Sequence, residues 1–482
     1  MPDVRDLIVI GAGSAGLAAA SLAARVGARV TLVESHRIGG DCTWTGCVPS
    51  KTLIHAAGVA HGMRRAEIFG LPRLEPKVDL GAVMDRVRAA IARVYAFESP
   101  EALIALGIEV VFGAARFRDQ WSIEVEGRIL RGRRFVIATG ASPVIPSISG
   151  LAATRHVTYE TIFGLTALPS RLVVLGAGPV GLELGQAFRR FGSHVTILDQ
   201  APRILPIADP EASAVVARRF GDEGVELRTG VSVDRVTTRD RSIVVTANGT
   251  EYAADTLLVA IGRRASVEGL ALERAGVTAN EKGVVVDTRL RTSRRHIYAA
   301  GDVTGAFQFT HYAAWQGLIA ARNALLPGWM RGIPPHVPWA VFTDPEVSHV
   351  GATEDEARRR ARDVHVHRWP VTRVDRAQTT GDDDGFVKLV ADPGGRLLGA
   401  TVVSAQASEL VNELVLALDR GLRVDDLART MHAYPTYGVA IQQAAGEAVL
   451  GRLTLGWRGR LLRATARRWV RWTSRAAEES PA

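Results

Sequence analysis

The chain has 482 residues, of which 47% are hydrophobic and 23% charged, a composition typical of a globular protein with two to four domains. Its only two cysteines, Cys42 and Cys47, exclude an extracellular disulfide scaffold and are too few for a structural zinc site. Because no signal peptide and no run of about 20 uncharged apolar residues is visible, we expect a cytoplasmic enzyme. We expect no metal site.

A dinucleotide-binding pattern stands at the start of the chain. The segment LIVIGAGSAGLAAASLAARVGARVTLVES, which starts at Leu7, predicts a buried strand, a glycine-rich turn, an amphipathic helix and a second strand. Gly11, Gly13 and Gly16 form a G-x-G-x-x-G turn, which lets a pyrophosphate approach the helix N-terminus. Glu34 ends the second strand 23 positions after the first of these glycines, where a carboxylate suits a ribose 2′-hydroxyl.

Both cysteines lie in the next stretch, GGDCTWTGCVPSK. The residues VPSKTLIHAAGVAHGM predict a helix, with Pro49 in the first turn, where proline is tolerated. The helix N-terminus and Lys51 would both lower the pKa of a nearby thiol, and one turn can bring the two sulfurs within disulfide range. Two incidental thiols are the alternative, but the specific flanking residues favour a redox function for Cys42 and Cys47.

The dinucleotide-binding pattern repeats at an offset of 165 residues. The second copy, LVVLGAGPVGLELGQAFRRFGSHVTILDQ, carries Gly176, Gly178 and Gly181 in its turn and Asp199 at the end of its second strand. One such turn is weak evidence, since ordinary glycine-rich turns exist. Two copies, each with its acidic residue in place, predict two bound dinucleotides.

The later part of the chain predicts more strands and a separate domain. Apolar strands that end in glycine are expected at 135–140, 257–262 and 297–303. After the proline-rich boundary at 331–338, the pattern changes to an α+β domain. Its expected strands are VFTDPEV, GFVKLV and LLGATVVSA, and its expected helices are at about 353–362, 407–420 and 437–450.

The net charge of +9 is concentrated at the C-terminus, where residues 451–482 hold eight arginines against Glu478 and Glu479. Read as a helix, this tail has an arginine stripe (Arg460, Arg463, Arg467 and Arg471) and an apolar side (Trp457, Leu461, Leu462, Trp469 and Trp472). Such a helix can lie peripherally at an anionic membrane surface. Packing in a dimer and a solvated tail are the alternatives, and we expect no nucleic-acid binding because no basic groove appears elsewhere.

The cysteine stretch resembles the active-site motif of the class I pyridine nucleotide–disulfide oxidoreductases, which include dihydrolipoyl dehydrogenase, glutathione reductase and mercuric reductase. The similarity covers roughly residues 4–450 and includes ATG at 138–140, AIGR at 260–263, AAGD at 299–302 and FTDPEVSHVG at 342–351. The resemblance implies an α/β fold with two Rossmann-like dinucleotide-binding domains, for FAD and NAD, and a C-terminal α+β dimerisation domain.

The same resemblance implies the domain limits. They are 1–150 and 270–335 for the FAD domain, 151–269 for the NAD(P) domain, 336–450 for the dimerisation domain and 451–482 for the basic tail. It further implies a homodimer in which each active site borrows residues from the partner chain.

The resemblance also implies roles for individual residues. Cys42 would meet the substrate, and Cys47 would lie against the flavin. Lys51 would lie near flavin N5 in an ion pair with Glu183. The implied FAD contacts are Gly11, Gly13, Gly16, Glu34, Lys51, Ala115, Gly140, Asp302 and Thr310. The implied NAD contacts are Gly176, Gly178, Gly181, Glu183, Asp199, Val231 and Gly262.

One departure from the family concerns the acid–base pair of its disulfide-reducing members, a His-Pro-Thr motif followed by Glu. In HAYPTYGV, Tyr434 takes the histidine position and Val439 the glutamate position, while His432 lies two residues early. His432 is either a displaced base or a packing residue, and Tyr434 is a poor base at neutral pH. Mercuric reductases likewise carry Tyr here, but we find neither their C-terminal cysteine pair nor an N-terminal metal-binding domain, so the likeness describes the family better than the substrate.

The resemblance implies that electrons pass from NADH through FAD to the Cys42–Cys47 disulfide, and that the resulting dithiol or the reduced flavin itself passes them to an acceptor. The departure at Tyr434 and Val439 favours a quinone or a metal ion as that acceptor. A dihydrolipoyl dehydrogenase or other disulfide reductase is the first alternative, and a flavoprotein sensor or membrane-associated interaction protein is the second. NADH is expected over NADPH, because the Asp199 carboxylate would repel a 2′-phosphate.

Overall fold

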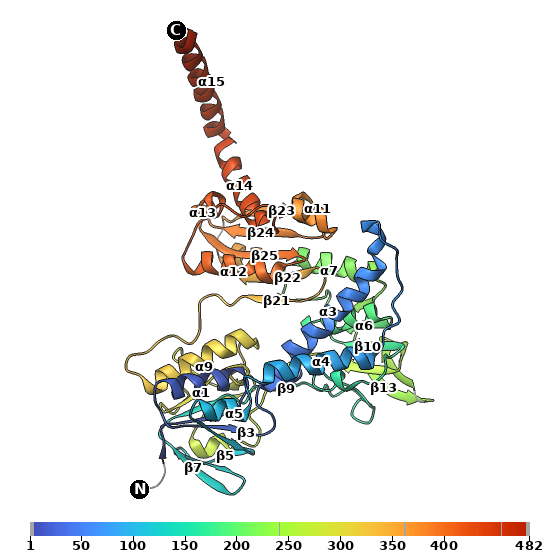
Figure 1. Ribbon diagram of the computed structural model, residues 1–482, viewed down its shortest axis with the longest axis vertical. Coiled ribbons are helices and arrows are strands. Elements are labelled where there is room, and N and C mark those ends of the chain that lie inside the picture. The colour runs from blue at the N-terminus through green and yellow to red at the C-terminus, as the bar shows by residue number, and fades with distance from the viewer. Residues whose placement is uncertain (1–3, 241, 361–362, 455, 479–482) are drawn as a thin grey trace. The chain divides into compact units, whose positions relative to one another are not determined.

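The structure is a computed structural model that describes residues 4–240, 242–360, 363–454 and 456–478. The backbone forms two compact units. Unit 1 comprises residues 1–206 and 220–334, and unit 2 comprises residues 207–219 and 335–482. Figure 1 shows both and labels many of their elements.

Unit 1 contains a five-stranded parallel sheet in the order β20-β8-β2-β3-β4. Its strands are β2 (Leu7–Ile10), β3 (Val30–Glu34), β4 (Ile108–Phe112), β8 (Phe135–Ile137) and β20 (Ile297–Ala299). Successive side chains of β2 point to opposite faces, as the period of a strand requires. Leu7 and Val9 join a core with the helices, whereas Ile8 and Ile10 join a core with a second, smaller sheet.

Two helices lie side by side and cover the face of the sheet that carries Leu7 and Val9 (Figure 1). They are α1 (Ser14–Arg25) and α9 (Thr310–Leu325). Their backbones approach so closely that a Cβ on Gly317 would lie 2.0 Å from the Ala15 carbonyl oxygen. The other face packs on a sheet of order β1-β7-β6-β5. Its strands are β1 (Val4–Arg5), β5 (Ala115–Asp119), β6 (Ser122–Val125) and β7 (Arg128–Gly132).

A second parallel sheet in unit 1 has the order β12-β11-β10-β16. Its strands are β10 (Arg171–Leu175), β11 (His194–Asp199), β12 (Glu226–Thr229) and β16 (Thr256–Val259), and α6 (Pro179–Phe191) connects β10 to β11. Both predicted strand–turn–helix–strand repeats are therefore confirmed. An antiparallel sheet of β13 (Val233–Arg239), β14 (Ser242–Ala247) and β15 (Thr250–Ala254) packs on it.

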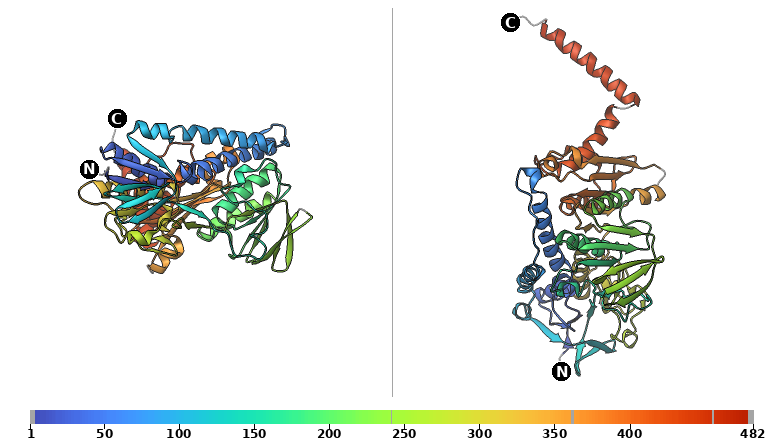
Figure 2. Two further views of the ribbon diagram at one scale, coloured as in Figure 1. Left: turned by 90° about the horizontal axis from the view of Figure 1, so that it is seen from below. Right: turned by 90° about the vertical axis from the view of Figure 1, so that its right-hand side faces the viewer.

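The remaining elements of unit 1 include the helices that carry and support the cysteine stretch. The helix α3 (Cys47–Arg64) confirms the predicted helix, and it runs beside α4 (Leu80–Tyr95) (Figure 2). The shorter elements are α2 (Gly40–Trp44), α5 (Pro100–Ala105), α8 (Leu272–Ala275), β9 (Ala141–Pro143), β17 (Arg263–Ala265), β18 (Ala279–Asn280) and β19 (Gly283–Val284).

Unit 2 is built on an antiparallel sheet in the order β21-β22-β25-β24-β23. Its strands are β21 (Trp339–Val341), β22 (Glu346–Gly351), β23 (His365–Pro370), β24 (Phe386–Ala391) and β25 (Leu397–Ser404). Its helices are α10 (Glu354–Arg360), α11 (Asp375–Thr380), α12 (Ala407–Asp419), α13 (Val424–Arg429) and α14 (Val439–Thr454).

The predicted elements of this unit are largely confirmed. The exception is VFTDPEV, which was expected as one strand but is divided between β21 and β22. Pro345 has no amide hydrogen for a strand ladder, and Thr343 Oγ1 instead donates to the Pro345 carbonyl at 2.8 Å. Residues 361–362 of the predicted helix at 353–362 lie outside the described residues.

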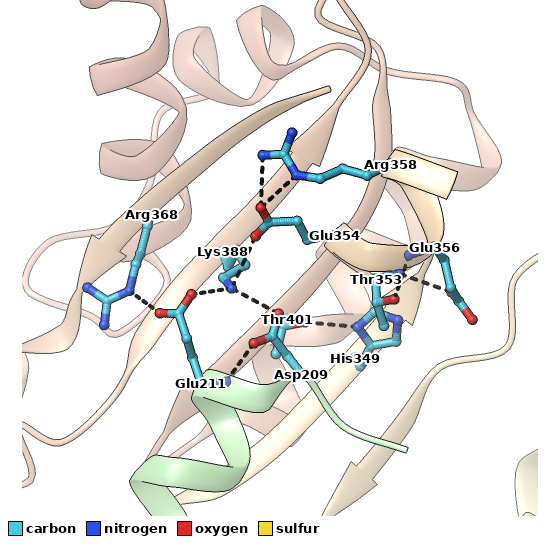
Figure 3. A network of polar contacts seen from close by, with 10 residues as sticks. All are labelled: Asp209, Glu211, His349, Thr353, Glu354, Glu356, Arg358, Arg368, Lys388 and Thr401. Carbon is cyan, nitrogen blue, oxygen red and sulfur yellow. Dashed lines mark hydrogen bonds and ion pairs between the residues drawn. The ribbon is translucent and has the colours of Figure 1, made fainter. Parts of the chain in front are cut away.

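A buried ionic network explains why residues 207–219, which include the first residues of α7 (Pro210–Asp222), belong to unit 2 (Figure 3). Lys388 of β24 is 3% exposed and donates to Asp209 Oδ2 at 2.9 Å and to a carboxylate oxygen of Glu211. Burial alone would lower the pKa of Lys388, but these hydrogen bonds raise it above its ordinary value. A buried ammonium must be paired, so this contact fixes the segment on the sheet.

The tail forms the helix α15 (Gly456–Glu478), which extends beyond the sheet of its own unit (Figure 1). The large apolar side chains of its predicted apolar side are all exposed by 48% or more. Among the described helices, none combines the length and apolar character needed to cross a membrane.

Candidate active site

Each of the two repeats ends its first strand in a turn that only glycine fits. Gly11 has a φ of +100°, and a Cβ there would lie 2.4 Å from the Ala138 carbonyl oxygen. Gly176 has a φ of +109°, with the same 2.4 Å approach to the Ala260 carbonyl oxygen. The positive φ and the missing Cβ are both required, because backbone from the neighbouring strand fills the space.

The acidic residue of each repeat is held in the same way. Glu34 Oε2 accepts from the Ala12 amide at 2.7 Å, and its other oxygen accepts from the His36 amide at 2.8 Å. Asp199 accepts from the Ala177 amide at 2.5 Å and from the Ala201 amide at 2.7 Å. Glu34 and Asp199 occupy equivalent positions in the two repeats. Each carboxylate is held by the amide of the residue that follows the first glycine of its turn.

The two turns fit dinucleotides on the evidence of their own geometry. The helices α1 and α6 have Gly13 and Gly178 at their N-caps, so no capping side chain occupies their first amides. Amides at a helix N-terminus bind a pyrophosphate, and the adjacent carboxylate binds a ribose hydroxyl. The chain thus offers two cradles with the donor set that a dinucleotide requires.

The loop that joins the cysteines packs directly on the first cradle. The Gly39 amide donates to the Ala12 carbonyl at 2.8 Å, and a Cβ on Gly40 would lie 2.8 Å from Gly13 Cα. The short helix α2 carries Cys42, and α3 begins at Cys47. The redox loop, which we define as residues 39–47, is therefore fixed against the turn of the first repeat.

Main-chain hydrogen bonds close the turn between the two thiols. The Asp41 carbonyl accepts from the Thr45 amide at 2.9 Å and also from the Gly46 amide. A Cβ on Gly46 would lie 2.8 Å from the same carbonyl oxygen, so glycine is needed there. The turn places Cys42 in hydrogen-bond contact with Cys47, and both are free thiols in this structure.

The surroundings of Cys47 favour its thiolate. The hydrogen bond from Cys42 lowers the pKa of Cys47 to about 6, against the effect of burial, with further help from Thr310 and Lys51. Thr310 Oγ1 lies 3.1 Å from Cys47 Sγ. Cys47 and Thr310 are the first residues of α3 and α9, and helix N-termini stabilise negative charge. The same pairing and burial raise the pKa of Cys42, so Cys42 keeps the proton.

Lys51 and Glu183, expected as an ion pair, lie 2.8 Å apart from Nζ to Oε2. Lys51 comes from α3 and Glu183 from α6, the helix of the second repeat. The carboxylate is 7% exposed and the ammonium 35% exposed, so solvent screens this pair only in part. The pair joins the cysteine helix to the second dinucleotide cradle within unit 1.

The other predicted FAD and NAD contacts lie around the two cradles. Ala115 begins β5, and the Val231 amide donates to the Asp199 carbonyl at 3.0 Å. Gly140 and Gly262 follow β8 and β16, both with positive φ. Asp302 lies three residues after the end of β20 and pairs with Arg263 Nη1 at 2.6 Å.

Sequence reasoning missed the hydroxyl of Thr310 at Cys47, and it missed Arg263, which also binds Asp41. The only signal for Arg263 was its place after Gly262 in AIGR.

Tyr434 and His432 lie in unit 2. The Tyr434 hydroxyl is exposed and donates to Asp375 Oδ2, and this hydrogen bond raises the pKa of Tyr434. His432 Nε2 lies 3.1 Å from both Glu413 carboxylate oxygens, and its Nδ1 lies 3.0 Å from the Thr430 carbonyl oxygen. Both ring nitrogens of His432 thus face acceptors within unit 2, an arrangement that fits either of the two roles left open above.

Comparisons with known proteins agree with this geometry. The model of the family described as "Pyridine nucleotide-disulphide oxidoreductase" matches residues 5–317, and that of its "dimerisation domain" matches residues 337–445. The chain is 38% identical to dihydrolipoyl dehydrogenase of Thermus scotoductus, covering 91% of this chain and 96% of that protein. It is 36% identical to a mercuric reductase of Lysinibacillus sphaericus, covering 92% and 82%.

Solved structures show the same relationship. The HOCl-induced flavoprotein disulfide reductase RclA from Escherichia coli is 30% identical and superposes with a TM-score of 0.84 over 92% of this chain and 99% of that one. LpdA from Mycobacterium tuberculosis is 31% identical, with a TM-score of 0.85 over the same shares.

The pKa of Cys47 gives a testable prediction. We expect the reduced protein to form one thiolate as the pH rises through about 6, while Cys42 stays protonated beyond the ordinary thiol range. Thiolate absorbance in the ultraviolet, measured against Cys47→Ser, reports this titration. Cys42→Ala should raise the pKa of Cys47 more than Cys42→Ser, which keeps a hydroxyl donor. A Cys47 pKa at the ordinary value of ~8.5 would contradict the assignment.

Proposed function

The chain belongs to the pyridine nucleotide-disulphide oxidoreductase family, and from this premise we propose that it is an NADH oxidoreductase whose Cys42–Cys47 couple delivers two electrons to a quinone or a metal ion. Members of this family are FAD-dependent enzymes that use a nicotinamide coenzyme. The family, the redox loop and the two cradles support the first half of the proposal. The acceptor rests on one further observation, in unit 2.

We propose that Gly11, Glu34, Asp302 and the N-terminus of α1 hold FAD, and that Gly176 and Asp199 hold NADH. FAD, when bound, supplies the hydride-accepting chemistry that the side chains lack. Lys51 would lie near its reactive ring, held by Glu183. The protein's own residues keep one proton on Cys42 and a negative charge on Cys47, the state of a reduced couple ready to give up two electrons.

The observation that carries the acceptor class is the state of Tyr434. A disulfide substrate needs a group that takes a proton from Cys42 and returns one to the leaving thiolate. The hydrogen bond to Asp375 raises the pKa of Tyr434, so even less phenolate is available near neutral pH to accept a proton, and Val439 has no group to orient a base. A quinone becomes a hydroquinone by taking two electrons, the Cys42 proton and one proton from solvent, and a metal ion displaces the thiol proton on binding.

The names of similar proteins support this acceptor class. Several relatives are named mercuric reductases, and RclA has been solved as a Cu(II) complex. A dihydrolipoyl dehydrogenase or other disulfide reductase remains the alternative, because relatives of equal similarity carry that name. A flavoprotein sensor with slow turnover is the alternative of another class, and steady-state NADH oxidation with a panel of acceptors distinguishes it.

The chain carries the family's dimerisation domain at residues 337–445. We propose that unit 2 uses it to form a homodimer in which Tyr434 of one chain serves the redox loop of its partner. The domain limits inferred from the sequence, with FAD bound by 1–150 and 270–335 and NAD by 151–269, are part of the same proposal, as is a cytoplasmic location.

The first prediction from this proposal tests the acceptor class. We expect poor turnover with lipoamide or glutathione disulfide and better turnover with a quinone or metal ion. Tyr434→His combined with Val439→Glu should raise disulfide turnover at least about tenfold, because it restores an oriented base. Val439→Glu alone is the matched control and should change little. Lipoamide turnover by the unaltered enzyme near ~10²–10³ s⁻¹ would refute the proposal.

The second prediction concerns the coenzyme. Asp199 lies where a 2′-phosphate would meet its carboxylate, and the Arg203 guanidinium donates to the Leu205 and Pro206 carbonyls. We expect kcat/KM to favour NADH over NADPH by about tenfold or more, the effect of ~1.4 kcal/mol. Asp199→Asn should reduce the preference, and Arg203→Gln should not. An NADPH preference in the unaltered enzyme would show that an arginine overrides Asp199.

The third prediction concerns α15. We propose that its arginine stripe and exposed tryptophans give weak peripheral binding to anionic membranes. The full chain should sediment with phosphatidylserine vesicles and be released by salt, whereas a chain ending at Thr454, where α14 ends, should not. Replacing Arg460, Arg463, Arg467 and Arg471 by Gln is the matched control for charge. Equal sedimentation of the full and shortened chains would refute membrane binding by α15.

A further inference from the structure

Arg263, the first residue of β17, lies at the centre of a polar cluster beside the redox loop. Its Nη2 donates to Asp41 Oδ2, its Nη1 lies 2.6 Å from Asp302 Oδ2, and its Nε donates to the Tyr159 hydroxyl at 3.1 Å. The Tyr159 hydroxyl in turn donates to Asp41 Oδ2 at 3.1 Å. The guanidinium carbon also lies 5.2 Å from the centroid of the Tyr159 ring.

The cluster is shielded from solvent on its inner side. The side chain of Arg263 is 20% exposed and that of Asp302 is 13% exposed, Tyr159 is buried, and the Asp41 side chain at the outer end is 36% exposed. Charge-assisted hydrogen bonds from a planar guanidinium fork are strong and directional when solvent is largely excluded. Arg263 therefore differs from the neighbouring Arg264, which forms an exposed surface pair with Glu268.

Asp41 connects this cluster to the thiols. Its side chain is held by Arg263 and Tyr159, and its backbone carbonyl accepts the Thr45 and Gly46 amides that close the turn before Cys47. Cys42 follows Asp41 directly in the chain. Asp41 therefore binds Arg263 and Tyr159 through its carboxylate, and it closes the turn between the two cysteines through its carbonyl.

We propose that Arg263 and Tyr159 are positioning residues that fix the redox loop through Asp41 and thereby raise the effective concentration of Cys42 for Cys47. The inference rests on the proposed redox function of this pair. Holding two reacting groups in place makes their bond formation effectively unimolecular, so a firmly held loop favours the disulfide over the dithiol. Loosening the anchor should therefore make the disulfide easier to reduce.

The test is the equilibrium between disulfide and dithiol in the FAD-loaded protein, measured in dithiothreitol redox buffers by thiol labelling and mass spectrometry. Tyr159→Phe removes one hydrogen bond to Asp41 without changing any charge, and Asp41→Asn removes the charge that Arg263 binds. We expect both to lower the equilibrium constant for disulfide formation, Asp41→Asn by about tenfold, which equals a potential about 30 mV less negative. Arg264→Gln is the matched control and should leave the constant unchanged.

The two variants separate positioning from charge. A change in Asp41→Asn alone would show that the carboxylate acts only through its field on Cys42, and it would overturn the inference. No change in either variant, with flavin content and unfolding temperature retained, would overturn it as well. If the unaltered thiols fail to titrate as one two-electron couple, the proposed function itself fails, which is a distinct result. Tyr159→Phe keeps the test decisive if Asp41→Asn does not fold.

Discussion

The chemistry of this protein depends on a thiolate held at the point where two helices begin. Cys47 is the first residue of α3, and Thr310, whose hydroxyl lies 3.1 Å from the sulfur, is the first residue of α9. Helix N-termini present amides that favour negative charge by ~0.3–1 kcal/mol each. The arrangement requires α9 to lie close to the redox loop, which the small residues Gly317 and Ala15 permit by letting α9 and α1 meet backbone to backbone.

The two charges that act on Cys47 oppose each other, so hydrogen bonds decide the pKa of Cys47. The Lys51 ammonium lowers that pKa, but its partner Glu183 raises it, and the hydrogen bond from Cys42 has the largest effect. On the other side of the loop, Asp41 is neutralised by Arg263. The ion pairs therefore serve mainly to hold α3 against α6 and to hold the redox loop in place. The hydrogen bonds between the two sulfurs and from the Thr310 hydroxyl determine which cysteine carries the proton.

Sequence patterns predicted the parts of this structure that depend on neighbouring residues. The two repeats, the helix after Cys47 and most strands of unit 2 follow from glycine spacing and apolar periodicity, which are local. The Thr310 hydroxyl reaches Cys47 across 263 residues, and Lys388 binds Asp209 across 179, so no local pattern could reveal either contact. The division of VFTDPEV could have been foreseen, because Pro345 cannot donate to a ladder. The Arg263 cluster could not, because Tyr159 stands in a stretch without a recognisable motif.

Proton placement connects the thiol pair to the kind of acceptor that suits it. The reduced pair holds one proton, which the hydrogen bond between the sulfurs and burial keep on Cys42. Attack on a disulfide requires that proton to leave before the new bond forms, and in unit 2 the residue at the expected base position donates its own hydroxyl to Asp375. A metal ion needs no such base, because coordination itself expels the thiol proton, and a quinone oxygen accepts the proton together with the electrons. This distribution of protons is the physical reason for proposing an acceptor that removes the Cys42 proton without help from a protein base.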